Sequence, residues 1–434
     1  MQQLQKNNKK LIRSWAMFDW ANSVYNLVIT STIFPAYYLI VTSSAEHGDM
    51  VRFFGWEVIN TVLSNYALGF AYLVMALALP FLSAYADANG KKLSLMKLFT
   101  YIGAASCMGL FFFKLETLEI SIVFFALAAM GYIGGVAMNN SYLPVIATPD
   151  QQDEVSAKGF AYGYVGCVLL QLICFVIIFK REWFGIEDPS LPARISFFLV
   201  GLWWLGFSQI PFRTLPPNAP SVQNGLSLGG RVRQEFIHVL GRIKNIESIK
   251  KFLPAYFFSA VGVQTIMIVA TPFGEKVLQL GTTKLIATII CIQLVAIGGA
   301  YLMSILTRTL GNIKVLIGVI FFWVCICVYA YFLNNEIQFY VLAVMVGLLM
   351  GGIQSLSRST YSKLLPEDLE DTTSFFSFYD VTEKLAIVVG LFSFGFIEQI
   401  THNIRFSALS LSIFFILSLI LMFRMLKFNK GLES

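Results

Sequence analysis

The sequence predicts an all-α polytopic membrane protein in which twelve transmembrane helices form two pseudo-symmetric six-helix bundles. Of the 434 residues, 57% are apolar and only 13% are charged, whereas a soluble domain carries about 25% charged residues. Apolar stretches recur along the whole chain, and paired sequence signals stand at one offset in its two halves. The composition excludes a soluble enzyme, a nucleic-acid binder and a disordered scaffold.

Twelve stretches are long and apolar enough to cross a bilayer as helices, because lipid offers no partner for unpaired backbone groups. The first follows a basic segment but is too long and too polar for a cleaved signal peptide. The six cysteines lie inside apolar runs, which argues against a disulfide or zinc framework. We expect spans at residues 15–41, 60–84, 95–113, 119–142, 159–179, 194–212, 252–275, 284–307, 313–333, 337–359, 373–397 and 403–426.

Lysine and arginine concentrate on one side of this topology. With the N-terminus inside, the inner segments carry 22 of these residues and the outer segments carry 8. Short loops rich in Lys and Arg stay on the cytoplasmic side. We therefore expect a multi-pass protein of the plasma or inner cell membrane with both termini in the cytoplasm.

A polar connection at residues 213–251 separates an N-terminal six-helix bundle, residues 1–212, from a C-terminal one, residues 252–434. The second part of this connection is basic, and four apolar residues recur in it at helical spacing: Phe236, Ile237, Leu240 and Ile243. The pattern predicts an amphipathic helix at the membrane surface. The alternative is a docking helix for a partner.

The two halves carry matching signals in the loops after the second and eighth spans. Each loop holds a serine, then a charged residue, then a glycine. An internal repeat of this kind is typical of transporters. Three pairs of residues are each 221 positions apart: Ser83 and Ser304, Asp87 and Arg308, and Gly90 and Gly311.

The loop after the second span, SAYADANGKK, resembles the G-x-x-x-D-[RK]-x-G-[RK]-[RK] motif of the major facilitator superfamily, with Ser83 and Ala88 replacing two consensus residues. Five segments are similar to its vacuole-effluxer-like, autophagy-related branch: FDWANSVY (18–25), NNSYLPVIA (139–147), VSAKGFAYGYVG (155–166), GVQTI (262–266) and GGIQSLSRS (351–359). The resemblance implies the major facilitator fold and transport of small organic solutes such as amino acids. In span seven, Ala260 and Val261 replace an Asn-Asp pair common in that branch, so the role of that carboxylate does not carry over.

Polar residues inside the spans are costly in lipid and therefore face the bundle interior. In span one, Asp19, Asn22 and Asn26 fall on one helical face. For the lone amides and the threonine, a hydrogen bond between helices is the alternative to a cavity role. The substrate-cavity candidates are Asp19, Asn22, Tyr25, Asn26, Asn139, Asn140, Gln264, Thr265, Gln293 and Gln354.

Span eleven holds the strongest group of charges, formed by Asp380, Glu383 and Lys384. Asp380 and Lys384 are four residues apart and can pair along one helical face. A carboxylate that moves between wet and dry surroundings couples its protonation to conformation. These three residues are therefore candidates for proton coupling, and a self-contained salt bridge is the alternative.

The loop after span two predicts a cytoplasmic gate made by Asp87, Gly90, Lys91 and Lys92, together with Arg358 toward the inner end of span ten. Glycine at position 90 permits a tight turn because it tolerates positive φ. When the cytoplasmic side is closed, we expect Asp87 to accept hydrogen bonds from the N-terminal amides of span eleven or to pair with a basic residue there.

Together these features predict a secondary active transporter that moves a small organic solute by alternating access, with protons as a candidate coupling ion. The alternatives are a membrane-embedded enzyme and a lipid-handling carrier that use the same cavity. The three histidines are far apart in sequence, and no nucleotide-binding loop or nucleophile motif accompanies the acids. We expect no cofactor, no metal site and no nucleic-acid partner, and a monomer in the bilayer.

Overall fold

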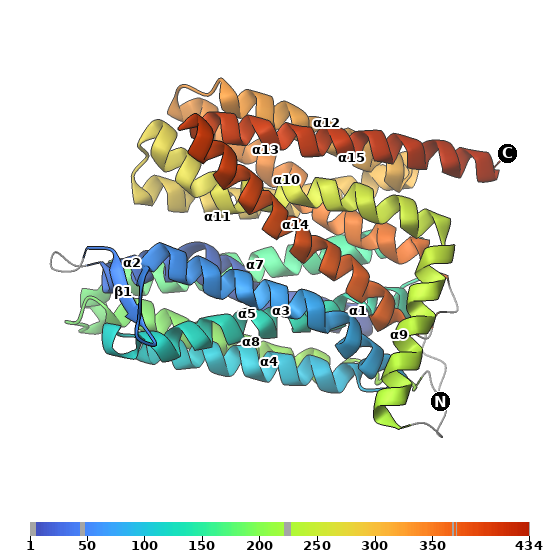
Figure 1. Cartoon of the computed structure of the whole chain (residues 1–434), viewed down its shortest axis with the longest axis horizontal. Coiled ribbons are helices and arrows are strands. Elements are labelled where there is room, and N and C mark those ends of the chain that lie inside the picture. The colour runs from blue at the N-terminus through green and yellow to red at the C-terminus, as the bar shows by residue number, and fades with distance from the viewer. Residues whose placement is uncertain (1–5, 44–47, 221–226, 367–368, 370, 434) are drawn as a thin grey trace.

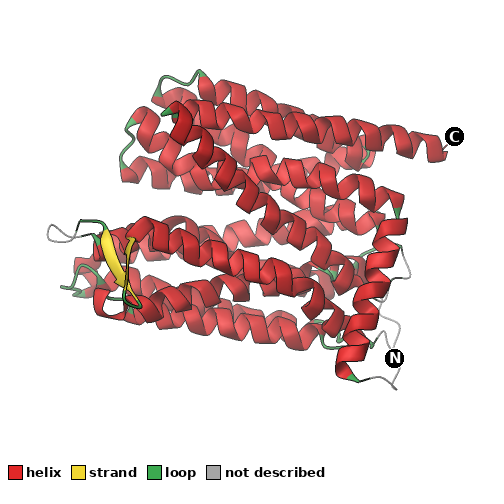
Figure 2. Cartoon of the chain, viewed as in Figure 1, coloured by secondary structure: helices red, strands yellow, loops and turns green. Residues whose placement is uncertain are grey.

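The computed structural model describes residues 6–43, 48–220, 227–366, 369 and 371–433. Within these ranges, twelve helical segments are long and apolar enough to cross a membrane. Helices make up nearly all of the described chain (Figure 2). Each segment coincides with a stretch that the hydropathy of the sequence predicts, so the all-α polytopic fold class is confirmed.

The helices follow one another with short connections. The first half holds α1 (Lys9–Val24), a π-helix (Tyr25–Ile33), α2 (Phe34–Thr42), α3 (Asn60–Asn89), α4 (Lys92–Gly109), α5 (Leu118–Asn140), α6 (Leu143–Ile146), α7 (Gln152–Phe179) and α8 (Leu191–Thr214). Three short 3-10 turns lie at Leu110–Phe112, Leu115–Thr117 and Arg181–Phe184. After α9 (Leu228–Asn245) come α10 (Glu247–Leu278), α11 (Thr282–Leu310), α12 (Asn312–Tyr331), α13 (Glu336–Leu364), α14 (Thr372–Thr401) and α15 (Ile404–Glu433).

The first span is not a regular α-helix along its whole length. Between α1 and α2, the residues Tyr25–Ile33 form a π-helix, in which backbone bonds reach five residues back. The hydroxyls of Ser31 and Thr32 donate to the carbonyls of Asn26 and Leu27, also five residues earlier. Residues beyond Tyr25 therefore depart from the face that a period of 3.6 residues assigns to them.

The spans form two bundles that lie side by side (Figure 1). One contains α1 to α8 and the other contains α10 to α15, and each has its own apolar core around a fully buried tryptophan, Trp204 in the first and Trp323 in the second. The bundles meet where α3 packs against α14 and where α7 packs against α11 and α13. These two contact zones hold the polar contacts that join the bundles.

A small β-hairpin lies at one end of the first bundle (Figure 2). Its strands, β1 (Met50–Phe53) and β2 (Trp56–Ile59), are antiparallel, with Met50 opposite Ile59. Phe54 and Gly55 both adopt positive φ in the two-residue turn. We refer to this end of the molecule as the hairpin end. The hydropathy of the sequence does not predict this hairpin.

The helix α9 crosses the opposite end of the molecule, where α1 begins and α15 ends (Figure 1). We refer to this as the α9 end. The predicted amphipathic helix is present, but its apolar residues differ in burial: Ile243 is buried, Phe236 stacks on Phe81 of α3 at 4.8 Å, and Ile237 is 56% exposed. The helix therefore packs partly on the protein, because it bridges the bundles rather than lying only on lipid.

Candidate functional site

At the α9 end, a carboxylate of one bundle holds the start of a helix of the other. Asp87 lies in the last turn of α3 and is fully buried. Its Oδ2 accepts a hydrogen bond from the backbone amide of Ser374, in the first turn of α14, at 2.6 Å. The first amides of a helix have no partner within the helix, and its N-terminus attracts negative charge. The hydrogen bond that the sequence predicts between Asp87 and the eleventh span is present.

The turn after α3 brings a second group to the same place. Gly90 ends the helix at φ +64°, and a Cβ at this position would lie 2.7 Å from the carbonyl oxygen of Asn218. The turn directs Lys92 into the interface, where its Nζ donates to Thr372 Oγ1 at 2.7 Å and its exposed fraction is 1%. Lys91, also predicted for the gate, is exposed.

A second set of contacts closes the other contact zone at the α9 end. Glu154 pairs with Arg308 at 2.6 Å, and both side chains are more than half exposed. Asp153, buried in the first turn of α7, accepts from three side chains of the other bundle: Thr307 Oγ1 at 2.8 Å, Asn312 Nδ2 at 2.7 Å and Lys363 Nζ at 2.6 Å. We call the contacts of Asp87 and Lys92 with α14 the first latch, and the contacts of Asp153 and Glu154 with the second bundle the second latch. The acid lies in the last turn of a helix in the first latch and in the first turn of a helix in the second.

Arg358 lies deeper between the bundles, on α13 between Lys363 of the second latch and Gln354. It is 3% exposed, and its guanidinium reaches across the interface. A buried charge stays compensated only while its partner is in place. The contacts of Arg358 with the first bundle are Asp19 Oδ2 at 3.2 Å, Asn140 Oδ1 at 3.2 Å, the Ser156 hydroxyl at 3.0 Å and carbonyl at 2.8 Å, and the rings of Trp15 and Phe160.

A glycine allows this approach. At Gly159 of α7, a Cβ would lie 2.4 Å from Asp19 Oδ2 and 2.7 Å from an Arg358 nitrogen. Such distances are too short for any side chain to fit without moving the ion pair. Gly159 in span five therefore allows the two bundles to approach closely at this position.

Two asparagines extend the network on both sides of Arg358. Asn139 Nδ2 donates to Asp19 Oδ1 at 3.2 Å, and Asn140 Nδ2 donates to Asp380 Oδ1 at 2.9 Å. Asp380 is 1% exposed, and its second oxygen accepts no hydrogen bond from any described residue. Asp19, Arg358, Asn140 and Asp380 thus form a continuous polar network that crosses the interface three times.

Next to this polar network lies a pocket of about 320 Å³, including space open to solvent. Glu383 stands in its wall and accepts from Gln264 Nε2 at 2.6 Å and from Lys384 Nζ at 2.5 Å. The expected pairing of Asp380 with Lys384 is wrong, because Lys384 pairs with the adjacent Glu383 instead. The lining residues are Phe160, Tyr256, Ser259, Ala260, Val263, Gln264, Ile353, Gln354, Ser357, Tyr379 and Glu383.

A family model of vacuole effluxer Atg22-like proteins matches residues 7–434 of the chain. The chain belongs to this family. It is 28% identical over 421 residues to the "Uncharacterized MFS-type transporter YxiO" of Bacillus subtilis. The alignment covers 96% of this chain and 95% of that protein. It is 23% identical over 463 residues to "Autophagy-related protein 22-2" of Emericella nidulans, with 84% and 77% covered.

Solved structures show that this Atg22-like protein has the major facilitator fold. A major facilitator superfamily transporter, FucP, in its outward conformation superimposes with a TM-score of 0.70 at 12% identity, covering 95% of this chain and 98% of that one. The human organic anion transporter MFSD10 gives a TM-score of 0.72 at 10% identity, covering 96% and 100%. The family membership and the fold that the sequence motifs imply are both confirmed.

The structure separates the ten cavity candidates of this Atg22-like protein into two groups. Only Gln264 and Gln354 line the pocket, and Gln354 Oε1 accepts from Tyr164 at 2.6 Å. Asp19, Asn139 and Asn140 belong to the buried network described above rather than to the pocket wall. The polar stripe of span one therefore faces the interior, but it does not line this pocket.

The remaining candidates are packed elsewhere. Tyr25 donates to the Phe125 carbonyl at 3.3 Å inside the first bundle, and Thr265 bonds the Val261 carbonyl of its own helix at 2.6 Å. Gln293 donates to Gln171 Oε1 at 3.2 Å between α11 and α7. Asn22 is 1% exposed, Asn26 is partly buried, and neither reaches the pocket. The bonds of Thr265 and Gln293 are the alternative that the sequence left open for them. Asn22 Oδ1 accepts no hydrogen bond from any described residue.

Several residues of the site went unnoticed in the sequence. Tyr256 and Tyr379 stack at 4.4 Å in the pocket wall, and Tyr164 holds Gln354. Aromatic residues are common in apolar spans, so their type carries no signal of a cavity. Asp153 could have been found from the sequence. It is an acid in the first turn of span five, and span eleven, whose first turn contacts Asp87, is the corresponding span of the other half.

Proposed function

We propose that this protein is a secondary active transporter that moves a small organic solute by alternating access. One observation carries the proposal: the polar contacts between the bundles are confined to the α9 end and the middle of the molecule. Beyond the Gln171–Gln293 pair toward the hairpin end, no hydrogen bond or ion pair joins the bundles within the described ranges. A carrier closed at one end has this asymmetry.

The charge bias of the loops supports an α9 end that faces the cytoplasm. In this orientation both termini are cytoplasmic and the described conformation is outward-facing. We further propose that the protein acts as a monomer in the plasma or inner membrane. The latches of Asp87 and Asp153 then form the cytoplasmic gate. Opening that gate breaks the contacts of Arg358 and Asn140 as well, because they cross the same interface.

The pocket suits a small polar solute. It offers a carboxylate on Glu383, amides on Gln264 and Gln354, and the rings of Tyr256 and Tyr379. Amino acids carry groups that pair with all of these donors and acceptors, and they are the class that the family resemblance implies. We take amino acids as the first solutes to test.

Protons are the proposed coupling ion. Asp380 is buried and bonded to Asn140 of the other bundle while the α9 end is closed. Separation of the bundles removes that donor and admits water, so the carboxyl group changes surroundings in each cycle. Glu383 follows Asp380 by three residues on α14 and lines the pocket. It therefore places a second carboxyl group next to the solute.

Purified protein in proteoliposomes tests the proposal. A mixture of labelled amino acids is supplied outside, with and without an imposed pH gradient, and protein-free liposomes serve as the control. We expect saturable uptake that the gradient increases. Thermal stabilisation of the purified protein by individual solutes identifies the substrate. Absence of saturable uptake and of exchange for every amino acid, sugar and nucleoside tried contradicts the proposal.

A further inference from the structure

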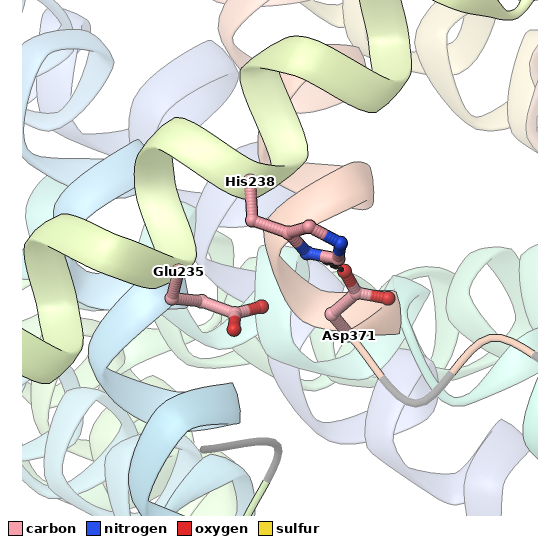
Figure 3. A group of neighbouring side chains, drawn as sticks. All are labelled: Glu235, His238 and Asp371. Carbon is pink, nitrogen blue, oxygen red and sulfur yellow. Dashed lines mark ion pairs between the residues drawn. The ribbon is translucent and has the colours of Figure 1, made fainter.

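A group of potential metal ligands lies outside the transport pathway, where α9 crosses the start of α14 (Figure 3). Glu235 and His238 project from α9 toward Asp371, which directly precedes α14. One ligand atom from each of the three lies within 4.8 Å of the others. We propose that Glu235, His238 and Asp371 bind a divalent first-row transition-metal ion.

The donor set has the chemistry that such ions require. An imidazole nitrogen and two carboxylate oxygens are ligands for Zn²⁺ and its first-row neighbours. Glu235 and His238 are three residues apart on one helix, so both reach the same side of it. Ligand bonds to Zn²⁺ are about 2.0–2.2 Å long. Donors that already lie within 4.8 Å of one another therefore need only side-chain rotations to converge on an ion.

The surroundings of Asp371 provide a second and independent reason. The residue is 4% exposed, and neither carboxylate oxygen accepts a hydrogen bond from the part of the chain that the structure describes. The basic side chains that face it are His238, with Nδ1 at 3.4 Å, and Arg242, with a guanidinium nitrogen at 3.7 Å, both beyond a normal hydrogen bond. A buried carboxylate in this state is costly, and a bound cation would compensate it.

The arginine leaves room for an ion. Arg242 faces Asp371 Oδ1, whereas His238 faces Oδ2. The guanidinium also lies over the ring of Phe375 at 5.6 Å, where it can remain when Oδ2 binds a metal. Its positive charge nevertheless opposes a cation at this distance. Arg242 is therefore a competitor whose removal should strengthen metal binding.

A bound ion would join three helices at the α9 end. It would link α9 to the start of α14, where Asp87 of α3 already holds the Ser374 amide. Phe236 of α9 stacks on Phe81 of α3 and completes the triangle. The ion would therefore favour the arrangement in which this end is closed. This consequence rests on the proposed transport function, whereas metal binding itself does not.

Binding is tested on the full-length protein, purified without a polyhistidine tag and stripped with a chelator. Zn²⁺ should bind with a stoichiometry of one in calorimetry and raise the melting temperature, whereas Mg²⁺, which prefers oxygen ligands, should do neither. His238→Asn should weaken Zn²⁺ binding at least about tenfold. The matched control is His402→Asn: this exposed histidine at the far end of α14 has φ +51°, a conformation that Asn tolerates.

Arg242→Gln gives the complementary result. If Asp371 is a ligand, loss of the competing charge should tighten Zn²⁺ binding relative to the wild type. Equal Zn²⁺ affinity in the wild type, His238→Asn and Arg242→Gln would overturn the site, even if all three proteins are folded. Zn²⁺ binding that depends on His238 in a protein without solute uptake supports the metal site and contradicts only the transport proposal.

Discussion

The carboxylate of Asp87 caps a helix that begins 285 residues later in the chain, because its Oδ2 lies 2.6 Å from the amide nitrogen of Ser374. The carboxylate and the helix belong to different bundles. The hydrogen bond therefore exists only while the bundles are in contact at the α9 end. Its loss should change the balance between conformations more than it changes the stability of either bundle.

Asp87→Asn should shift the protein toward the conformation that is open at the α9 end. A charge-assisted hydrogen bond contributes about 1.5–3 kcal/mol, which corresponds to roughly a ten- to hundredfold change in a two-state equilibrium. The reporter is Ser355→Cys, a buried position whose carbonyl bonds Ser156 of the other bundle. In a background without the six native cysteines, its maleimide labelling should accelerate by that factor.

Asp150→Asn is the matched control for this experiment. Asp150 lies at the same end, and hydrogen bonds from Thr148 and Gln151 hold its pKa below the ordinary value, so it is a full negative charge. Asp150 makes no hydrogen bond or ion pair with the other bundle in the described structure, and the charge of Lys363 on that bundle is the smallest of the influences on its pKa. Labelling that is unchanged in Asp87→Asn, or raised equally by Asp150→Asn, would show that Asp87 merely ends its own helix.

The second latch should depend on its buried member. Asp153 is buried and accepts three hydrogen bonds across the interface, whereas Glu154 and Arg308 form an exposed pair. Exposed ion pairs contribute about 0–1 kcal/mol. Asp153→Asn should therefore accelerate labelling of the Ser355→Cys reporter clearly more than Arg308→Gln does. Equal effects of the two substitutions would mean that burial does not determine the strength of this latch.

The outline of the fold could be predicted from the sequence, but the pocket could not. Long apolar stretches define the spans because lipid leaves the backbone no other solution. The Asp87 contact followed from two local features that topology brings together, an acid at a loop and a free helix start. In contrast, Tyr25 and Thr265 satisfy their hydroxyls on nearby carbonyls, and nothing in their residue type distinguishes that from a cavity role. The π-helix after α1 also shifts the face on which Asn26 falls.

Gly159→Ala should destabilise the closed arrangement. The added methyl group would lie 2.4 Å from Asp19 Oδ2 and must displace the ion pair with Arg358. Gly206→Ala on α8 is the control, because a Cβ there meets nothing within 4 Å. We expect a lower melting temperature and faster labelling of the Ser355→Cys reporter only for Gly159→Ala. If both variants melt like the parent protein, the bundles do not approach as closely as the structure indicates.

The proposed proton coupling can be separated from solute binding at Glu383. This carboxylate accepts hydrogen bonds from Gln264 and Lys384 in the pocket wall, and glutamine retains the shape and one acceptor but cannot exchange a proton. Glu383→Gln should therefore abolish accumulation driven by a pH gradient while solute exchange between equal pools continues.

Glu398→Gln serves as the control, since Glu398 lies on the same helix but pairs with the exposed Lys276 near the hairpin end. Asp380→Asn should reproduce the loss if the buried acid transfers the proton. If gradient-driven accumulation survives in both Glu383→Gln and Asp380→Asn, neither carboxyl group carries the coupling ion. If Glu383→Gln loses exchange as well as accumulation, Glu383 binds the solute instead.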